Sequence, residues 1–152
     1  MGRQISGGAG LIKLFTGSYI APGSVRTMDE RVARAAVRAA HRRGRRVFAH
    51  PSNRAGTQVA VQAGVDALAH VPDQPEGTEA LLREAAQRGI RIVPTLHMFA
   101  STVTTEERYL GPIRDALRVF LEAGGRVLFG TDVGYLADAI PAVSSPPWPG
   151  PA

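Results

Sequence analysis

The sequence of 152 residues contains no cysteine, so disulfide bonds and thiolate metal sites are both excluded. Any metal ion would need histidine, aspartate, glutamate or a chemically modified lysine as its ligands. Lysine is nearly absent too, because seventeen of the eighteen basic residues are arginine and only Lys13 remains. A lysine amine loses its proton readily on burial, whereas an arginine guanidinium does not. Lys13, inside the apolar run Leu11–Phe15, is therefore a candidate for chemistry.

Long apolar runs are also missing. No segment approaches the roughly twenty apolar residues of a membrane span, and residues 1–8 contain no hydrophobic signal core. Aromatic residues make up only 6% of the chain and do not alternate with basic ones, as a nucleic-acid stacking surface requires. The arginines of residues 42–46 fall at a predicted helix end, where cations complement the helix dipole. We therefore expect a small-molecule substrate, no nucleic-acid or membrane partner and, by default, a cytoplasmic location.

A repeated unit organises what is present. In four segments a glycine ends an alanine-rich helical stretch, apolar or β-branched residues follow, and a polar residue stands six places after the glycine. The pairs are Gly44 with His50, Gly64 with His70, Gly89 with Thr95, and Gly125 with Thr131, which Asp132 follows. Strands that alternate with helical crossovers predict an α/β fold with about five parallel strands.

Helix boundaries and domain limits follow from local signals. Capping-box patterns at 27–30 and 104–107 predict helices that run to about Arg43 and about Ala123. Two further helices are expected, one at 55–63 and one ending at Gln87. Residues 1–140 would form one domain. The tail 141–152 contains five prolines and a glycine, and we expect it to be disordered.

Four polar side chains stand at or near the ends of predicted strands: Lys13, His50, His70 and Asp132. Because active sites of parallel α/β folds lie at the carboxyl ends of the strands, we predict that the four converge on one metal site. Each has a simpler interpretation when taken alone: a snorkelling lysine, a structural histidine, or an aspartate that caps a helix. Their joint occurrence favours the metal site, and Thr95 and Thr131 would support strand ends by hydrogen bonding.

Four short segments, in order along the chain, match strand motifs of one known family, and a fifth, Val93–Leu96, stands where another strand of that family is expected. The four are Ile12–Gly17, Ala49–Pro51, Ala63–His70 and Phe129–Asp132. These segments resemble strands four to eight of the amidohydrolase superfamily, metal-dependent hydrolases with a (β/α)8 TIM barrel, and most closely its imidazolonepropionase- and prolidase-like branch. The resemblance covers about residues 10–138 and implies a partial TIM barrel.

The resemblance also implies a chemistry. Lys13 would react with carbon dioxide to form a carbamate, an anionic ligand shared by two divalent metal ions, of which zinc is the expected one. His50 and His70 would bind the second ion, and Asp132 would bind the first and take a proton from the bridging water. Asp132 would then pass this proton to the leaving amine. The implied substrate contains a C–N bond in an amide, a dipeptide or a cyclic amide.

Loop residues after the predicted strands are candidates for substrate contact: Tyr19, Asn53, Arg54 and His97. The sequence departs from the family at one important point, because no two of its four histidines form a His-x-His pair, which supplies two metal ligands in the family. We therefore expect that strands one to three are missing, that one metal ion binds more easily than two, and that open sheet edges could pair with another chain. The alternative hypothesis is a non-catalytic remnant that needs a partner or an N-terminal half.

Overall fold

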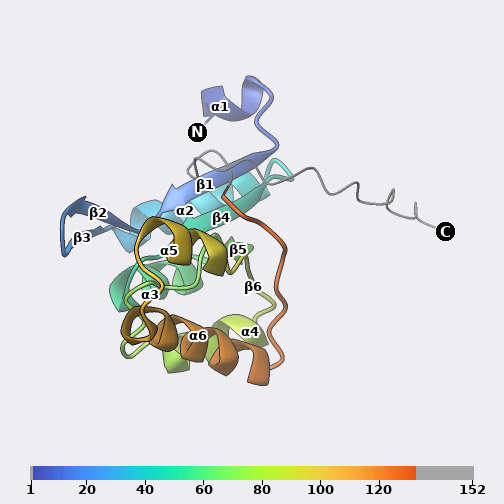
Figure 1. The fold of residues 1–152 in the computed structure, drawn as a ribbon. Helices are drawn as coiled ribbons and strands as arrows, with labels where there is room; N and C mark the ends of the chain where they lie inside the picture. The colour runs from blue at the N-terminus through green and yellow to red at the C-terminus, as the bar shows by residue number, and fades with distance from the viewer. Residues whose placement is uncertain (1, 133–152) are drawn as a thin grey trace, which may run out of the picture.

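A computed structural model describes residues 2–132 of the chain (Figure 1). It contains a parallel four-stranded sheet of order β1-β4-β5-β6, flanked by helices, and a separate antiparallel hairpin of β2 and β3. The strands are β1 (Leu11–Phe15), β2 (Gly17–Ala21), β3 (Ser24–Thr27), β4 (Arg46–His50), β5 (Ala67–Leu68) and β6 (Arg91–Ile92). The helices are α1 (Gly2–Ser6), α2 (Glu30–His41), α3 (Arg54–Ala63), α4 (Glu79–Gln87), α5 (Leu96–Thr102) and α6 (Glu107–Glu122). The predicted α/β class with a parallel sheet is confirmed.

Side chains along β1 alternate between the two faces of the sheet. Ile12 and Leu14 are buried, whereas Lys13 and the exposed Phe15 point to the opposite face of the sheet. Strand β4 pairs with β1 in parallel, and the register places Phe15 level with His50. The side chains of Lys13, Phe15 and His50 therefore share one face, opposite to the face that carries Ile12 and Leu14.

The helices cover the apolar face and complete the core. Strand residues such as Val47, Leu68 and Ile92 are fully buried in one cluster with helix residues such as Leu82 of α4 and Phe120 of α6. Helices α4 and α6 pack against each other and lie together on one side of the sheet in Figure 1. Burying this apolar surface is the dominant favourable term that holds the strands in place.

The sheet is smaller than the sequence predicts. Four strands pair in the described part, and the segment predicted as a fifth forms only a bridge between Ile92 and Val127. Backbone hydrogen bonds from Ile92 N to Arg126 O and from Leu128 N to Ile92 O join this segment to β6. It is an edge segment with one neighbour, and its Phe129 is 95% exposed, so little burial supports a longer ladder.

Both predicted capping boxes are wrong in detail. Asp29, not Thr27, caps α2, because its carboxylate accepts the backbone N–H groups of Arg31 and Val32. Thr27 instead ends β3, where pairing with Gly17 of β2 uses its backbone. In α6 the N-cap position belongs to Glu106, whose backbone N–H is held by the hydroxyl of Thr104. The helices end within two residues of the predicted positions.

The β2–β3 hairpin, which the sequence analysis did not predict, packs backbone to backbone on the start of α3. A Cβ at position 56 would overlap the carbonyl oxygen of Pro51 and would lie 2.8 Å from the Cα of Gly17. A Cβ at position 17 would overlap the same carbonyl oxygen. Only glycine fits at these two positions, and their contact fixes the chain immediately after His50.

Two of the sequence predictions concern the ends of the chain. Residues 133–140 of the predicted domain and the proline-rich tail 141–152 lie outside the described residues. Among residues 2–132, no helix has the length and apolar character needed to span a bilayer.

The backbone contact at Gly56 yields a prediction. Replacing Gly56 by Ala should lower the free energy of unfolding by about 1–3 kcal/mol, because the added methyl group overlaps backbone atoms that cannot move independently. Gly10→Ala is the matched control, since a Cβ at position 10 meets nothing within 4 Å, and its effect should stay under about 0.5 kcal/mol. Urea unfolding monitored by circular dichroism measures both. An unchanged stability of Gly56→Ala would contradict the described packing.

Candidate active site

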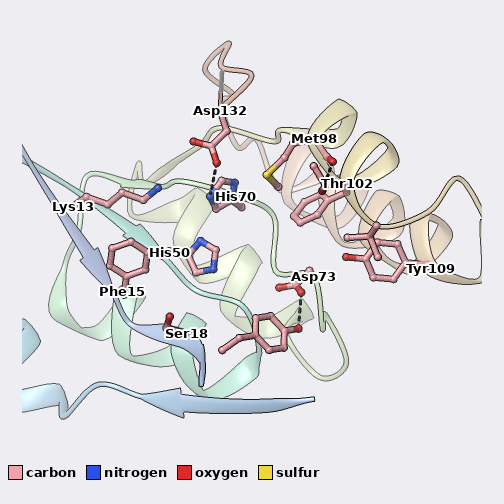
Figure 2. A pocket seen from close by; sticks show the side chains of 13 residues that line it. Lys13, Phe15, Ser18, His50, His70, Asp73, Met98, Thr102, Tyr109 and Asp132 are labelled. Atoms are coloured by element: carbon pink, nitrogen blue, oxygen red, sulfur yellow. Dashed lines mark hydrogen bonds and ion pairs between the residues drawn. The ribbon is translucent and has the colours of Figure 1, made fainter. Parts of the chain in front are cut away.

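A cavity of about 940 Å³ opens beside the carboxyl ends of β1, β4 and β5 (Figure 2). Its lining combines polar groups and aromatic or apolar side chains: Lys13, Phe15, Ser18, Tyr19, His50, His70, Asp73, Met98, Phe99, Thr102, Val103, Tyr109 and Asp132. All four residues that the sequence predicts as metal ligands line this one cavity, as does Tyr19. They come from segments up to 119 positions apart in the sequence, which the fold brings together.

The ring of His70 is held at its Nδ1 and has a carboxylate near its Nε2. Its Nδ1 lies 2.7 Å from the hydroxyl oxygen of Thr95, and its Nε2 lies 3.9 Å from Oδ2 of Asp132. Strand alternation would turn His70 to the same face as Leu68, but the backbone bends at residues 69–70, and the ring enters the cavity. Burial, reinforced by the charges of His50 and Lys13, lowers the pKa of His70 to about 4. The imidazole is therefore neutral at pH 7.

His50 has a defined tautomer. The hydroxyl of Ser52 donates its single proton to the carbonyl oxygen of Gly17 at 3.1 Å, so its oxygen accepts from Nε2–H of His50, also at 3.1 Å. The Nδ1 of His50 then carries a free lone pair. Burial, with the charge of Lys13, lowers the pKa of His50. The centroids of the His50 and His70 rings lie 4.7 Å apart in a T-shaped arrangement.

Lys13 reaches the cavity from β1. Its amine lies 5.5 Å from the centroid of the Phe15 ring, which in turn lies 5.6 Å from the ring of His50. Within residues 2–132, Lys13 forms no ion pair with a carboxylate. The amine of Lys13 therefore lines the same cavity as the two imidazoles without a carboxylate partner among the described residues.

Three residues around the cavity have left-handed backbones although they are not glycine. Ser52, Thr95 and Asp132 have φ values of 48°, 48° and 58°. Such conformations cost about 1–3 kcal/mol each and persist where the surrounding structure imposes them. Ser52 contacts His50, while Thr95 and Asp132 contact opposite sides of the His70 ring. The backbone strain is thus concentrated at residues whose side chains lie next to the two imidazoles.

The donor set can be compared with the needs of a divalent metal. Among the described residues, no three His, Cys, Asp or Glu side chains form a ready cluster for an ion. The available donors are Nδ1 of His50, Nε2 of His70 and the carboxylate of Asp132, and neutral imidazole is a common ligand of zinc. A carbamate on Lys13 would add an anionic ligand from the fourth lining residue. The chemistry of this donor set therefore fits one divalent ion once the carbamate completes it.

The remaining predicted substrate residues lie elsewhere. Asn53 caps α3, where its side-chain oxygen accepts the backbone N–H of Gly56. Arg54 begins α3, and the exposed His97 lies in α5, where its Nε2 contacts the hydroxyl of Ser101. None of the three lines the cavity. Their contact with a substrate stays a prediction.

Sequence reasoning missed Asp73 and Tyr109, which both line the cavity. Asp73 follows His70 by three positions, in the loop after β5, and accepts a hydrogen bond of 2.6 Å from the hydroxyl of Tyr19. A polar residue so soon after a strand end was the available signal. Tyr109 had no such signal, because it lies within helix α6 and not after a strand.

No protein-family model and no curated protein matches the sequence, but solved structures do. An amidohydrolase has 26% sequence identity and a TM-score of 0.69, and the match covers 86% of this chain and 35% of that protein. A Xaa-Pro dipeptidase with methionine bound in its active site has 26% identity and a TM-score of 0.65, over 87% and 36%. The ochratoxinase of A. niger has 26% identity and a TM-score of 0.65, over 85% and 32%.

The chain thus spans about a third of the length of the proteins that it matches. The match includes nearly all of the described fold, and the matched proteins are those that the strand motifs at Lys13, His50, His70 and Asp132 indicate. In structure as well as in sequence, the chain resembles the amidohydrolases and prolidases of the amidohydrolase superfamily.

Proposed function

We propose that this chain forms part of the (β/α)8 barrel of a metal-dependent hydrolase that cleaves a C–N bond in an amide, a dipeptide or a cyclic amide. The observation that carries the proposal is the shared cavity of Lys13, His50, His70 and Asp132. The names of the compared proteins, an amidohydrolase, a dipeptidase and an ochratoxinase, support the reaction class. The four parallel strands would correspond to half of a closed barrel.

The proposed ligands follow from the free donor atoms. His50 would bind a zinc ion through Nδ1, since its Nε2 faces Ser52, and His70 would bind through Nε2, since its Nδ1 faces Thr95. A carbamate on Lys13 and the carboxylate of Asp132 would supply the anionic ligands of this metal site. Bound metal of this kind lowers the pKa of a water molecule and polarises a carbonyl group.

The chain's own residues would carry out proton transfer and positioning. Asp132 would take a proton from the attacking water and deliver it to the nitrogen of the leaving amine. The strained Thr95 and Ser52 would hold the imidazoles in one orientation each, as groups behind metal ligands commonly do. Phe15 and Phe99, on either side of the histidine pair, would exclude water from the reacting bond.

One observation favours the alternative of a non-catalytic remnant. The described residues contain no His-x-His and no ready cluster of three histidine or carboxylate ligands. In that case the missing ligands would come from another polypeptide. Within residues 2–132, β1 pairs only with β4, so its other edge has backbone groups that a further strand could use.

Zinc binding tests the ligand assignment. The full chain should bind zinc in the presence of bicarbonate, and His50→Ala and His70→Ala should each weaken binding at least tenfold, because each removes one donor. His41→Ala is the matched control, since His41 pairs with Asp66 away from the cavity, and its affinity should stay within about twofold. Isothermal titration calorimetry measures all four proteins. Equal zinc affinity of the wild type and both cavity variants would overturn the assignment.

Hydrolysis tests the carbamate. Lys13→Arg should lose all hydrolysis of dipeptides that the wild-type chain shows, alone or with an added N-terminal barrel half, because a guanidinium forms no carbamate. Asp132→Asn keeps the size of the side chain but not its basicity, and should lose at least about a hundredfold in kcat. Retained activity of Lys13→Arg would rule out the carbamate. If the wild-type chain is inactive both alone and with the added N-terminal half, this result would support the alternative of a non-catalytic remnant.

The neutral state of His70 predicts a pH dependence of stability. Between pH 6.5 and about 4 the unfolded chain binds a proton at position 70 that the folded chain does not, so the free energy of unfolding falls as the pH falls through this window. The loss attributable to His70 should reach about 3 kcal/mol at its lower end. His70→Gln cannot bind this proton, so urea unfolding of the two metal-free proteins should show a steeper acid loss for the wild type. An equal fall of the unfolding free energy in both proteins over this pH range would contradict the neutral state of His70.

A further inference from the structure

Asp73 places a carboxylate in the cavity away from the four proposed ligands. It lies in the loop between β5 and α4, and its side chain is half-buried. In Figure 2, Asp73 and Lys13 lie on opposite sides of the histidine pair, so the cavity has a cationic wall and an acidic wall. The proposed hydrolytic chemistry does not use this carboxylate.

The charge of Asp73 has only a neutral partner. Its Oδ2 accepts from the hydroxyl of Tyr19 at 2.6 Å, and the side-chain amide of Gln74 donates to the same hydroxyl oxygen at 2.9 Å. Among residues 2–132, no Lys, Arg or His side chain pairs with Asp73. Burial raises the pKa of Asp73, and the hydrogen bond from Tyr19 opposes this effect. A half-buried carboxylate without a cation gains most from a ligand that supplies one.

The walls around Asp73 are aromatic. Tyr19 and Tyr109 line the cavity beside it, and Phe99 contacts Tyr109 edge to face with ring centroids 6.4 Å apart. Burial, together with the charge of Asp73, raises the pKa of Tyr109 to about 12, so its ring stays a neutral phenol. Aromatic faces attract cations and not anions.

We propose that Asp73, with the rings of Tyr19 and Tyr109, binds a protonated amine, and that substrates of this site are amides that carry such an amine apart from the bond that is cleaved. The claim that such amides are hydrolysed rests on the proposed function, whereas the claim that Asp73 binds an amine does not. A ligand held by its amine at Asp73 would extend toward His50 and His70, and its amine would lie on the side of the cavity opposite to Lys13. The aromatic and apolar lining would accept a hydrophobic link between the two ends.

A pair of matched probes tests the site. 2-Phenylethylamine and 2-phenylethanol differ in the presence of the cation, and both are titrated into the metal-free full chain while backbone amides are followed by NMR. The wild type should bind the amine at least tenfold more tightly than the alcohol, as expected for a hydrogen bond to a charged group. In Asp73→Asn, which keeps the size of the side chain and an acceptor for Tyr19, the preference should fall to about twofold or less.

Glu76→Gln is the matched control. Glu76 is another acid of the same loop, but it is exposed and does not line the cavity, so its removal should leave the amine preference intact. Equal affinities of the wild type for amine and alcohol, no detectable binding of the amine, or an undiminished preference in Asp73→Asn would each overturn the proposal. Because the probes are not hydrolysed and no metal is added, these outcomes are independent of whether zinc binding or hydrolysis succeeds.

Discussion

Side chains of a parallel sheet alternate between its two faces, and the candidate site depends on the register that this alternation imposes on β1 and β4. The pairing of Phe15 with His50 puts Lys13 and His50 on one face while Ile12 and Val47 fill the core on the other. A slip of one residue in β1 would turn Lys13 into the core and expose two apolar side chains to the cavity. Burial of the apolar face therefore fixes the positions of Lys13 and His50 on the other face.

The histidine pair shows how the fold sets protonation as well as position. Each ring has one nitrogen occupied by a hydroxyl, from Ser52 or Thr95, and burial holds both rings in the neutral state. Neutral imidazole is the form that binds metal, so this organisation of the two rings agrees with the ligand role proposed for them. The strain at the two hydroxyl-bearing residues is the cost of this organisation.

The cavity also separates opposite charges. Lys13 lies on one side of the imidazoles and Asp73 on the other, and neither forms an ion pair with a charged side chain among the described residues. Two unlike charges held apart across an aromatic-lined space orient a polar ligand along one direction.

The alternation of β1, β4, β5 and β6 with α2, α3 and α4 could be predicted from the sequence because the glycine-ended helices and apolar strands repeat regularly. Thr95 was predicted to support a strand end by hydrogen bonding, and its hydroxyl instead lies 2.7 Å from Nδ1 of His70. The bend that brings His70 into the cavity could not be predicted, since alternation from Leu68 points the other way. The β2–β3 hairpin was missed because its residues carry little apolar alternation, and Asp29 was overlooked because Thr27 satisfied the same capping pattern.

Tyr109 shows a different limit of the sequence. Its place in the cavity depends on how α6 packs against α5 and α4, and packing between helices leaves no mark on local residue spacing. The pattern of proposed ligands was readable because Lys13 lies in β1, His50 ends β4 and His70 stands two positions after β5. The wall opposite Lys13, in contrast, draws on a hairpin, a loop and two helices.

The contact between Gly17, Gly56 and the Pro51 carbonyl joins the hairpin to the loop after His50 without any intervening side chain. Surfaces that meet at backbone distance cannot slide or part without opening a void. The hairpin, the first turn of α3 and the loop that bears Ser52 should therefore move as a single rigid unit. A motion that widens the cavity for a bulky molecule would therefore have to occur on the side lined by residues of α5 and α6, such as Phe99 and Tyr109.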